Sequence, residues 1–256
     1  MSKKSMVVAF AIAVVAAFLI YNSDAMKERR IINALVVQNI EARGGENVWK
    51  SLDTLRLTGQ MDLGQGMHVP YVMEQKRPGK MCLEFVFDEQ TAIQCINGES
   101  GWKLLPFRGR NYPEPMTEQE FSAMAGGADI DGLLFNAVER GNKIEFIGKE
   151  VVAGRPATKL EVTLPGGEIR WVYVDDETGL DVKLETTRVV NGKERLVETY
   201  YYDWQETEGL LIPRRQESKT EGDTEFHFVT VDSVRRNPVL DDSRFAMPAT
   251  PGGGAS

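Results

Sequence analysis

Residues 54–63 read TLRLTGQMDL, and in this stretch the spacing of apolar side chains changes from helical to alternating. Alternate residues of an extended chain point to the same face, so the apolar members of the stretch share one side. These are Leu55, Leu57, Met61 and Leu63. The alternation predicts a β-strand that is buried on one face and polar on the other.

Before this strand, the apolar residues follow a helical period over residues 26–43. Ile31, Leu35 and Ile40 form much of one stripe, and Gly44-Gly45 is predicted to end the helix because glycine suits a left-handed C-cap. A further helical turn is predicted over residues 46–51, which presents Trp49 to the core.

Two more short helices are predicted in the middle of the chain. Thr117 and Glu120 have the spacing of a capping box, which predicts a helix that begins at Thr117. Residues 129–140 are predicted to form the second, which ends at Gly141. Helices this short are stable only when packed, so we expect both to lie across a sheet.

Alternating patterns after the first strand predict a long antiparallel meander of about ten strands. Strands joined by hairpin turns twist, so a sheet of this size must curl. The fold class is therefore α+β and mainly β. No linker-like composition divides residues 26–245, which are predicted to form a single domain. The further strand-like stretches are residues 67–76, 81–87, 91–96 and 101–106, and most of residues 143–234.

Composition excludes several classes of protein. The 256 residues are 42% hydrophobic and 27% charged, which is typical of a globular chain and unlike a disordered one. A net charge of −8 without a basic stripe argues against nucleic-acid binding. His68 and His227 are the two histidines, and Cys82 and Cys95 are the two cysteines. These are too few for a zinc cluster or a cysteine–histidine nucleophile, so we expect no metal and no cofactor.

Both ends of the chain have recognisable compositions. Lys3 and Lys4 precede an apolar run over residues 6–21, and Ser23-Asp24-Ala25 follows, which predicts a secretory signal over residues 1–25 and export to the periplasm. The alternative is an uncleaved membrane anchor, although a helix over 6–21 would be about 24 Å long, shorter than a ~30 Å hydrocarbon core. Residues 246–256 are rich in Pro, Gly, Ala and Thr and are predicted to be disordered.

Export changes the interpretation of the two cysteines. Residues 81–87 and 91–96 are both strand-like, and a hairpin that closes symmetrically about Asp88-Glu89 places Cys82 directly opposite Cys95. In an oxidising compartment this pair is predicted to form a disulfide. Two unpaired buried thiols remain the alternative, because a three-residue loop would shift the register by one.

The apolar strand faces are unusually rich in aromatic and methionine side chains. One interpretation is an ordinary core between the sheet and the helices. The other is a hydrophobic cavity, because a curled sheet with little helix to fill it leaves an apolar hollow, and flexible methionines suit varied apolar ligands. The predicted cavity residues are Leu57, Met61, Tyr71, Met73, Phe85, Trp102, Trp171, Tyr173, Tyr200, Tyr202 and Trp204.

A series of short motifs resembles those of a known family. In chain order they are Gly44-Gly45 with Trp49-Lys50-Ser51-Leu52-Asp53-Thr54-Leu55 and Gly59; Lys76-Arg77-Pro78-Gly79-Lys80 with Glu84 and Phe85; Asn97-Gly98 with Gly101-Trp102; Val174-Asp175 with Thr178-Gly179-Leu180; and Tyr202-Asp203-Trp204 with Gly209-Leu210 and Pro213. Together they resemble the exported outer-membrane lipoprotein-sorting proteins, relatives of the LolA and LolB carriers.

The resemblance implies a half-open antiparallel barrel with helices covering its concave face, on which acyl chains of lipoproteins or lipids are sheltered. Inner- and outer-membrane transport components are the implied partners. The chemistry is consistent with a shuttle, since about 14 exposed methylenes cost roughly 11 kcal/mol in water. The chain is longer than the classical carriers, and it has no N-terminal cysteine of the kind that anchors the receptor type.

Two other functions stay open at this point. An exported sensory or structural module could use the same hollow to bind a partner protein. An exported hydrolase is the third possibility, but Asp175-Asp176-Glu177 fits a solvated turn, and Ser100 lacks the Gly-x-Ser-x-Gly spacing of a nucleophile elbow.

Overall fold

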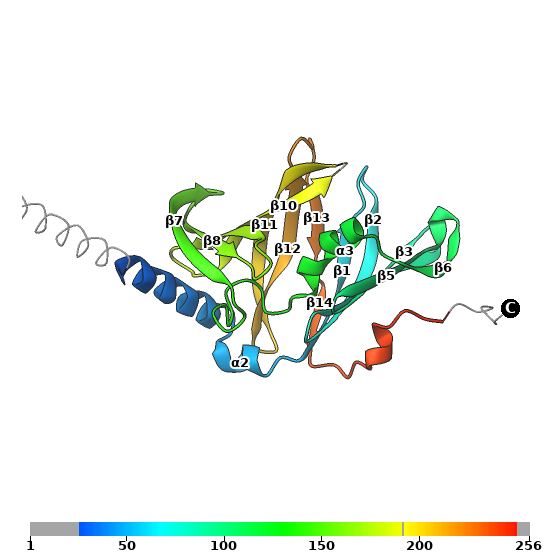
Figure 1. Cartoon of the computed structure of the whole chain (residues 1–256), viewed down its shortest axis with the longest axis horizontal. Coiled ribbons are helices and arrows are strands. Elements are labelled where there is room, and N and C mark those ends of the chain that lie inside the picture. The colour runs from blue at the N-terminus through cyan, green and yellow to red at the C-terminus, as the bar shows by residue number, and fades with distance from the viewer. Residues whose placement is uncertain (1–25, 191, 250–256) are drawn as a thin grey trace, which may run out of the picture.

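The computed structural model describes residues 26–190 and 192–249, and in it a single antiparallel sheet of fourteen strands dominates the fold (Figure 1). The strands are β1 (Thr54–Asp62), β2 (His68–Lys76), β3 (Lys80–Phe87), β4 (Gln90–Asn97), β5 (Ser100–Leu105), β6 (Arg110–Pro115), β7 (Lys143–Val152), β8 (Arg155–Thr163), β9 (Ile169–Asp175), β10 (Asp181–Val190), β11 (Lys193–Thr207), β12 (Leu210–Thr220), β13 (His227–Thr230) and β14 (Ser233–Arg236).

The sheet is open. Its order is β6-β5-β4-β3-β2-β1-β13-β12-β11-β10-β9-β8-β7, and β14 pairs with β1 beside this path, so β6 and β7 are the two edges. The prediction of a mainly antiparallel fold is confirmed, whereas the predicted number of about ten strands is too low. One reason is β6, which contains Pro113 and Pro115. Proline is tolerated on an edge strand, and sequence pattern alone does not indicate a strand there.

Helices are few. The described chain begins in an α-helix over residues 26–42, followed by α2 (Glu46–Lys50). α3 (Glu118–Ala125) begins with the predicted capping box, in which the Thr117 hydroxyl accepts from the Glu120 N–H. Three short 3₁₀ segments complete the helical part of the residues that the structure describes: η1 (Pro106–Arg108), η2 (Gly126–Ala128) and η3 (Asp242–Arg244).

The prediction of a second short helix over residues 129–140 is wrong. Residues 132–141 form a series of turns instead. Gly132 and Asn136 both have positive φ, at 73° and 49°, and a left-handed residue interrupts the repeating hydrogen bonds of an α-helix.

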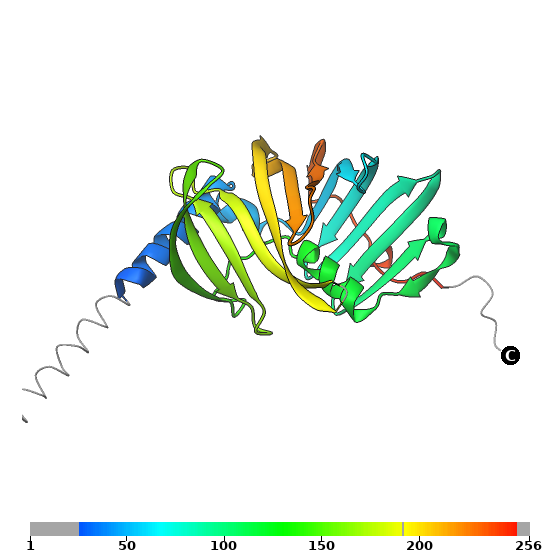
Figure 2. The same cartoon turned by 90° about the horizontal axis from the view of Figure 1, so that it is seen from above.

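Cross-strand register divides the sheet into two faces. We call the inner face the one that carries Leu160, Val172 and Leu184, which are paired in one row from β8 to β10. The N-terminal helix and residues 129–142 pack on this row through Leu35, Leu133 and Leu134 (Figure 2). The N-terminal helix and the turns of residues 129–142 therefore cover the inner face at the β7–β10 end of the sheet.

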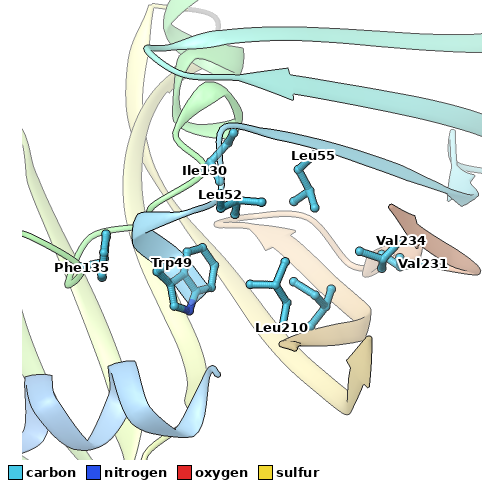
Figure 3. Packing of buried hydrophobic residues seen from close by; sticks show 9 residues of the cluster. Trp49, Leu52, Leu55, Ile130, Phe135, Leu210, Val231 and Val234 are labelled. Atoms are coloured by element: carbon cyan, nitrogen blue, oxygen red, sulfur yellow. The ribbon is translucent and has the colours of Figure 1, made fainter. Parts of the chain in front are cut away.

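Trp49 lies at the centre of a buried cluster that joins β1, β12 and residues 129–142. Its ring lies among Leu52, Leu55 and Leu210 and 6.0 Å from the ring of Phe135 (Figure 3). A fully buried tryptophan needs a partner for its N–H, and Trp49 Nε1 donates to the carbonyl of Arg43 at 3.2 Å.

Close backbone approach explains the first glycine motif. A Cβ at Gly44 would lie 2.1 Å from the carbonyl oxygen of Gly209, so no larger residue fits where the end of the N-terminal helix meets the turn before β12. The Gly44-Gly45 and Gly209-Leu210 motifs are therefore two sides of one contact.

The C-terminal segment lies on the opposite, outer face (Figure 1, red). Phe245 is fully buried against Cys82, Cys95 and Trp102, and its carbonyl accepts from Trp102 Nε1 at 2.9 Å. Cys82 and Cys95 are directly paired on β3 and β4 and form a disulfide, as predicted. We call residues 237–246 the C-terminal strap.

The predicted signal over residues 1–25, its alternative as an anchor, and residues 250–256 of the predicted disordered tail lie outside the described residues. Across the described ranges, every helix is too short or too polar to cross a bilayer.

Candidate functional site

An apolar layer covers the inner face at the β1–β5 end of the sheet. We call it the apolar wall. Val69, Tyr71, Phe85, Ala92 and Leu105 are buried at its base, while the other members are half-buried and reach solvent. The half-buried members are Leu57, Met61, Leu63, Met73, Leu83, Phe87, Phe107 and Val229.

Strand register assembles the wall. Leu57, Met73 and Leu83 form one cross-strand row, and Tyr71, Phe85 and Ala92 form the next. Two members lie outside the strands: Leu63 directly follows β1, and Phe107 belongs to η1, with its ring 5.2 Å from that of Phe87. The N-terminal helix, α3 and residues 129–142 contribute no member to the wall. Two wall residues, Leu57 and Met73, also pack against the clusters that contain Ile130 and residues of α3, so these elements reach the edge of the wall.

Tyr71 is the polar group at the base of the wall. Its hydroxyl donates to the carbonyl of Thr230 at 3.0 Å. Burial, together with the negative charge of Asp232, raises the pKa of Tyr71 well above its ordinary value. The phenol therefore stays neutral and hydrogen-bonded, which keeps the wall apolar.

Methionines form a second patch beside the wall, beneath α3 and η2. Met81, Ile96 and Ala128 are buried here. Met73, Met116, Phe121 and Met124 pack against them. Methionine has an unbranched, polarizable side chain that adapts to irregular shapes, so this patch can repack around different contacts.

α3 crosses the inner face from one side of the sheet to the other. Glu120 Oε1 lies 2.5 Å from Lys103 Nζ on β5, and Gln119 Nε2 donates to the carbonyl of Val189 on β10 at 2.8 Å. The hydrogen bond from Lys103, opposed in part by burial, lowers the pKa of Glu120. None of the residues of α3 is fully buried, so polar contacts at its ends and the methionine patch hold it in place.

The structure separates the predicted cavity residues by face. Leu57, Met61, Tyr71, Met73 and Phe85 lie together on the apolar wall. The remaining predicted residues lie elsewhere: Trp102, Trp171, Tyr173, Tyr200, Tyr202 and Trp204.

Trp102 is buried on the outer face beneath Phe245. Trp171, Tyr173 and Tyr200 form a separate outer-face cluster. Tyr202 is paired with Arg215 across β11 and β12, and the Trp204 ring lies 6.3 Å from that of Tyr201. The structure therefore does not bring these six residues to the wall.

The outer-face aromatics are embedded in charge. Trp171 Nε1 donates to Glu161 at 2.9 Å, and Lys183 Nζ lies 5.1 Å from the Tyr173 ring. Although burial opposes it, hydrogen bonding to Glu185 and Glu198 raises the pKa of Lys183. These rings pack beneath lysine side chains and pair with carboxylates, which gives them a structural role on the outer face.

Several wall residues escaped the sequence prediction, namely Leu63, Leu83, Phe87, Phe107 and Val229. Leu83 and Phe87 alternate with Phe85 on β3, and that alternation was the available signal. Phe107 and Val229 reach the wall from distant parts of the chain, and no local pattern indicates that position.

The residues considered for catalysis have other contacts. Asp175 accepts hydrogen bonds from the backbone N–H groups of Glu177 and Thr178, and although burial opposes it, hydrogen bonding to Thr178 lowers its pKa. His68 packs on the ring of Phe228, with centroids 4.8 Å apart, and His227 Nδ1 lies 3.5 Å from Asp62. Asp175 is therefore an ionised turn residue.

The motif residues mainly join one part of the fold to another. The Arg77 guanidinium donates to the carbonyls of Trp49 and Leu52 and pairs with Asp131. Asn39 of the N-terminal helix donates to the Gly179 carbonyl at 2.8 Å. The motifs therefore identify a scaffold rather than a set of ligand contacts. Among the described residues, no group of three or more His, Cys, Asp or Glu side chains could hold a metal ion.

No protein-family model matches the chain, and no curated protein matches its sequence. Solved structures do match. An outer membrane lipoprotein-sorting protein domain from Vibrio parahaemolyticus is 13% identical with a TM-score of 0.54, covering 75% of this chain and 89% of that one. A LolA superfamily protein from Nitrosomonas europaea is 12% identical with a TM-score of 0.55, covering 84% and 96%.

A third match is a DUF1329 family protein from Desulfovibrio piger, which is 13% identical with a TM-score of 0.57 and is covered over 97% of its length by 84% of this chain. At these identities the likeness concerns the fold. The resemblance expected from the sequence motifs is thus confirmed at that level: the chain has the fold of LolA superfamily and lipoprotein-sorting structures.

Proposed function

We propose that the protein is an exported carrier that shelters the acyl chains of lipids or lipid-modified proteins on the apolar wall. The observation that carries this proposal is the half-buried upper layer of the wall. Met61, Leu83 and Phe87 pack on a buried base yet are only half-buried themselves, on the side that elsewhere receives helices. A ligand that covered them would complete the core.

The energetics favour an acyl chain. Each buried methylene contributes about 0.8 kcal/mol, so a chain of about 14 methylenes gains roughly 11 kcal/mol on leaving water. The wall offers aliphatic, methionine and phenylalanine side chains. Its one deep polar group, the Tyr71 hydroxyl, is already satisfied by Thr230, so an apolar ligand meets no unpaired group there.

α3 supplies a movable cover in this proposal. It is held across the inner face by the Lys103–Glu120 and Gln119–Val189 contacts and by methionines that can repack. Contacts of this kind contribute little stability individually, so α3 can move aside without unfolding the sheet.

Export is part of the same proposal. The Cys82–Cys95 disulfide is consistent with an oxidising compartment such as the periplasm. The similarity to a lipoprotein-sorting domain supports membrane transport components as the donor and acceptor. Binding, rather than catalysis, is the activity proposed.

The experiment is to produce the full chain with its own N-terminal segment in an exporting bacterium and to analyse the purified protein by native mass spectrometry. We expect a complex with acyl-bearing molecules, and after delipidation we expect rebinding of a fluorescent fatty acid. A protein that is empty on purification and does not bind the fatty acid would contradict the proposal. Retention of a protein partner in place of lipid would favour a partner-binding module.

A further inference from the structure

A polar cavity of about 280 Å³ lies on the inner face, between the end of α3 and strands β9–β12. Its floor carries hydroxyl and amide groups, including those of Thr186, Thr199, Gln216 and Ser218. Arg170 of β9 and Arg188 of β10 line the same space. We call it the arginine cavity.

The two arginines are poorly neutralised by the protein. Arg170 Nε pairs with Glu168 at 2.7 Å, and Glu168 is the one carboxylate that lines the arginine cavity. Throughout the described part of the chain, the Arg188 side chain forms neither a hydrogen bond nor an ion pair, and Glu168 acts on it only through its charge. Burial and repulsion from Arg170 lower the pKa of Arg188, which is consistent with two guanidinium groups sharing one site.

The terminal nitrogens of Arg170 lie beside η2. A Cβ at Gly126 would be 3.3 Å from Arg170 Nη1, and a Cβ at the next residue, Gly127, would be 3.0 Å from Met81 Sδ. Consecutive residues of the chain therefore contact the arginine cavity and the methionine patch. The arginine cavity and the methionine patch are therefore separated by a single short segment, η2.

The floor of the inner face is also continuous between the arginine cavity and the apolar wall. Gln216 is paired with Val229, and Val229 is paired with Met61. Neighbouring strands are about 4.8 Å apart, so Gln216 at the near edge of the arginine cavity and Met61 on the apolar wall are separated by about 10 Å. The two arginines lie farther from the wall, on β9 and β10. One amphiphilic molecule can span both.

We propose that the arginine cavity binds the phosphate-bearing headgroup of an anionic lipid whose acyl chains lie on the apolar wall. This inference rests on the proposed carrier function and specifies its ligand class. Guanidinium groups bind phosphate oxygens through paired, charge-assisted hydrogen bonds, and the neighbouring hydroxyl and amide groups can donate further ones. An uncharged acylated molecule has no phosphate for these groups to bind, so the arginine cavity does not raise its affinity.

The test uses the delipidated full chain and two short-chain lipids with identical acyl chains, a phosphatidylglycerol and an uncharged diacylglycerol, with inorganic phosphate as a third probe. Affinity is measured by calorimetry. We expect the anionic lipid to bind more tightly than the uncharged one. Arg188→Gln should weaken binding of the anionic lipid about tenfold or more, because it removes a charge-assisted hydrogen bond to the phosphate, and should leave binding of the uncharged lipid unchanged.

Two further variants sharpen the result. Glu168→Gln should strengthen binding of the anionic lipid, because it removes the one competing carboxylate from the cavity. Arg215→Gln is the matched control, since Arg215 is also a strand arginine but directly precedes Gln216 on β12 and therefore points to the other face. It should change neither lipid's affinity.

The outcomes separate the two proposals. If both lipids bind equally and Arg188→Gln changes neither, the headgroup site is overturned while the carrier function stands. If inorganic phosphate binds through Arg188 as tightly as the anionic lipid does, the cavity is a free-anion site and the inference again fails. If neither lipid binds to the wild-type protein, the proposed carrier function itself is contradicted.

Discussion

Gln216 and Val229 are directly paired on β12 and β13, and the inner face changes from polar to apolar between them. On the Gln216 side the face carries hydroxyl groups and arginines beneath α3. On the Val229 side it carries the apolar wall. This boundary gives the inner face the polarity of an amphiphile, which motivates both proposals.

The first prediction concerns two residues of β3 that point to opposite faces. Leu83→Glu should reduce the affinity for a fluorescent fatty acid at least tenfold, because it places a charge on the apolar wall. Val86→Glu is the matched control, since Val86 is 45% exposed on the outer face. Fluorescence titration checks both, with circular dichroism to show that they fold. Equal loss in both variants would contradict the location of the site.

The outer-face aromatics provide a second, separate comparison. Trp171 donates to Glu161 and belongs to the outer-face cluster. Trp171→Phe should therefore lower stability by about 1 kcal/mol through the lost hydrogen bond and leave fatty-acid affinity unchanged. Urea unfolding and the same titration measure the two effects. A large loss of affinity with little loss of stability would place the ligand on the outer face.

The third prediction concerns the attachment of α3 and its pH dependence. In the folded chain the pKa of Glu120 is below its ordinary value of 4.5, through the hydrogen bond from Lys103. A lowered carboxyl pKa stabilises the folded state fully above that ordinary value, and this contribution is lost as pH falls through the folded-state pKa.

Release of bound fatty acid should therefore accelerate as pH falls below about 4.5, because α3 loses its contact with Lys103. Glu120→Gln should show faster release already at neutral pH and a weaker dependence on pH. Stopped-flow release from pH 3.5 to 7 measures both. Identical release rates for the wild type and the variant across this range would show that the contact does not restrain α3.

The fourth prediction concerns the C-terminal strap. Phe245→Ala should lower the free energy of unfolding by about 3–5 kcal/mol, because the ring is fully buried over Trp102 and the disulfide. Met247→Ala is the control, since Met247 is 44% exposed. Urea unfolding gives the stabilities. A small effect of Phe245→Ala would mean that the strap does not form part of the core.

The strap also shields the disulfide. Reduction of Cys82–Cys95 should cost about 3 kcal/mol of stability, from the loop-closure entropy of a crosslink between residues 13 apart. Because both cysteines are fully buried, reduction by dithiothreitol should be slow in the wild type and faster in Phe245→Ala. Thiol labelling over time measures the rates, and equal rates would contradict shielding by the strap.

Local patterns predicted the parts of the structure that local interactions determine. The Cys82–Cys95 pairing follows from the symmetry of one hairpin, and the Thr117–Glu120 capping box follows from residues three apart. The failed helix over residues 129–140 shows the limit. Its apolar residues have helical spacing, but contacts with distant groups, such as Arg77 with Asp131, determine its path.

The location of the candidate site depends on distant pairing. Aromatic residues alternate on both faces of these strands, and the sequence does not specify which face receives the helices. Tyr71 and Tyr173 have similar local patterns, yet one lies at the base of the wall and the other beneath Lys159 and Lys183. A one-residue change of register would exchange the faces. The face on which each aromatic residue lies can therefore be determined only from the three-dimensional structure.

Photo-crosslinking tests the central claim most directly. The delipidated protein is loaded with a fatty acid that carries a photoreactive group along its chain, irradiated and mapped by peptide mass spectrometry. We predict adducts on residues of the apolar wall, above all Met61, Met73 and Leu83. Adducts confined to the outer face, at Val86 or Trp171, would contradict the account.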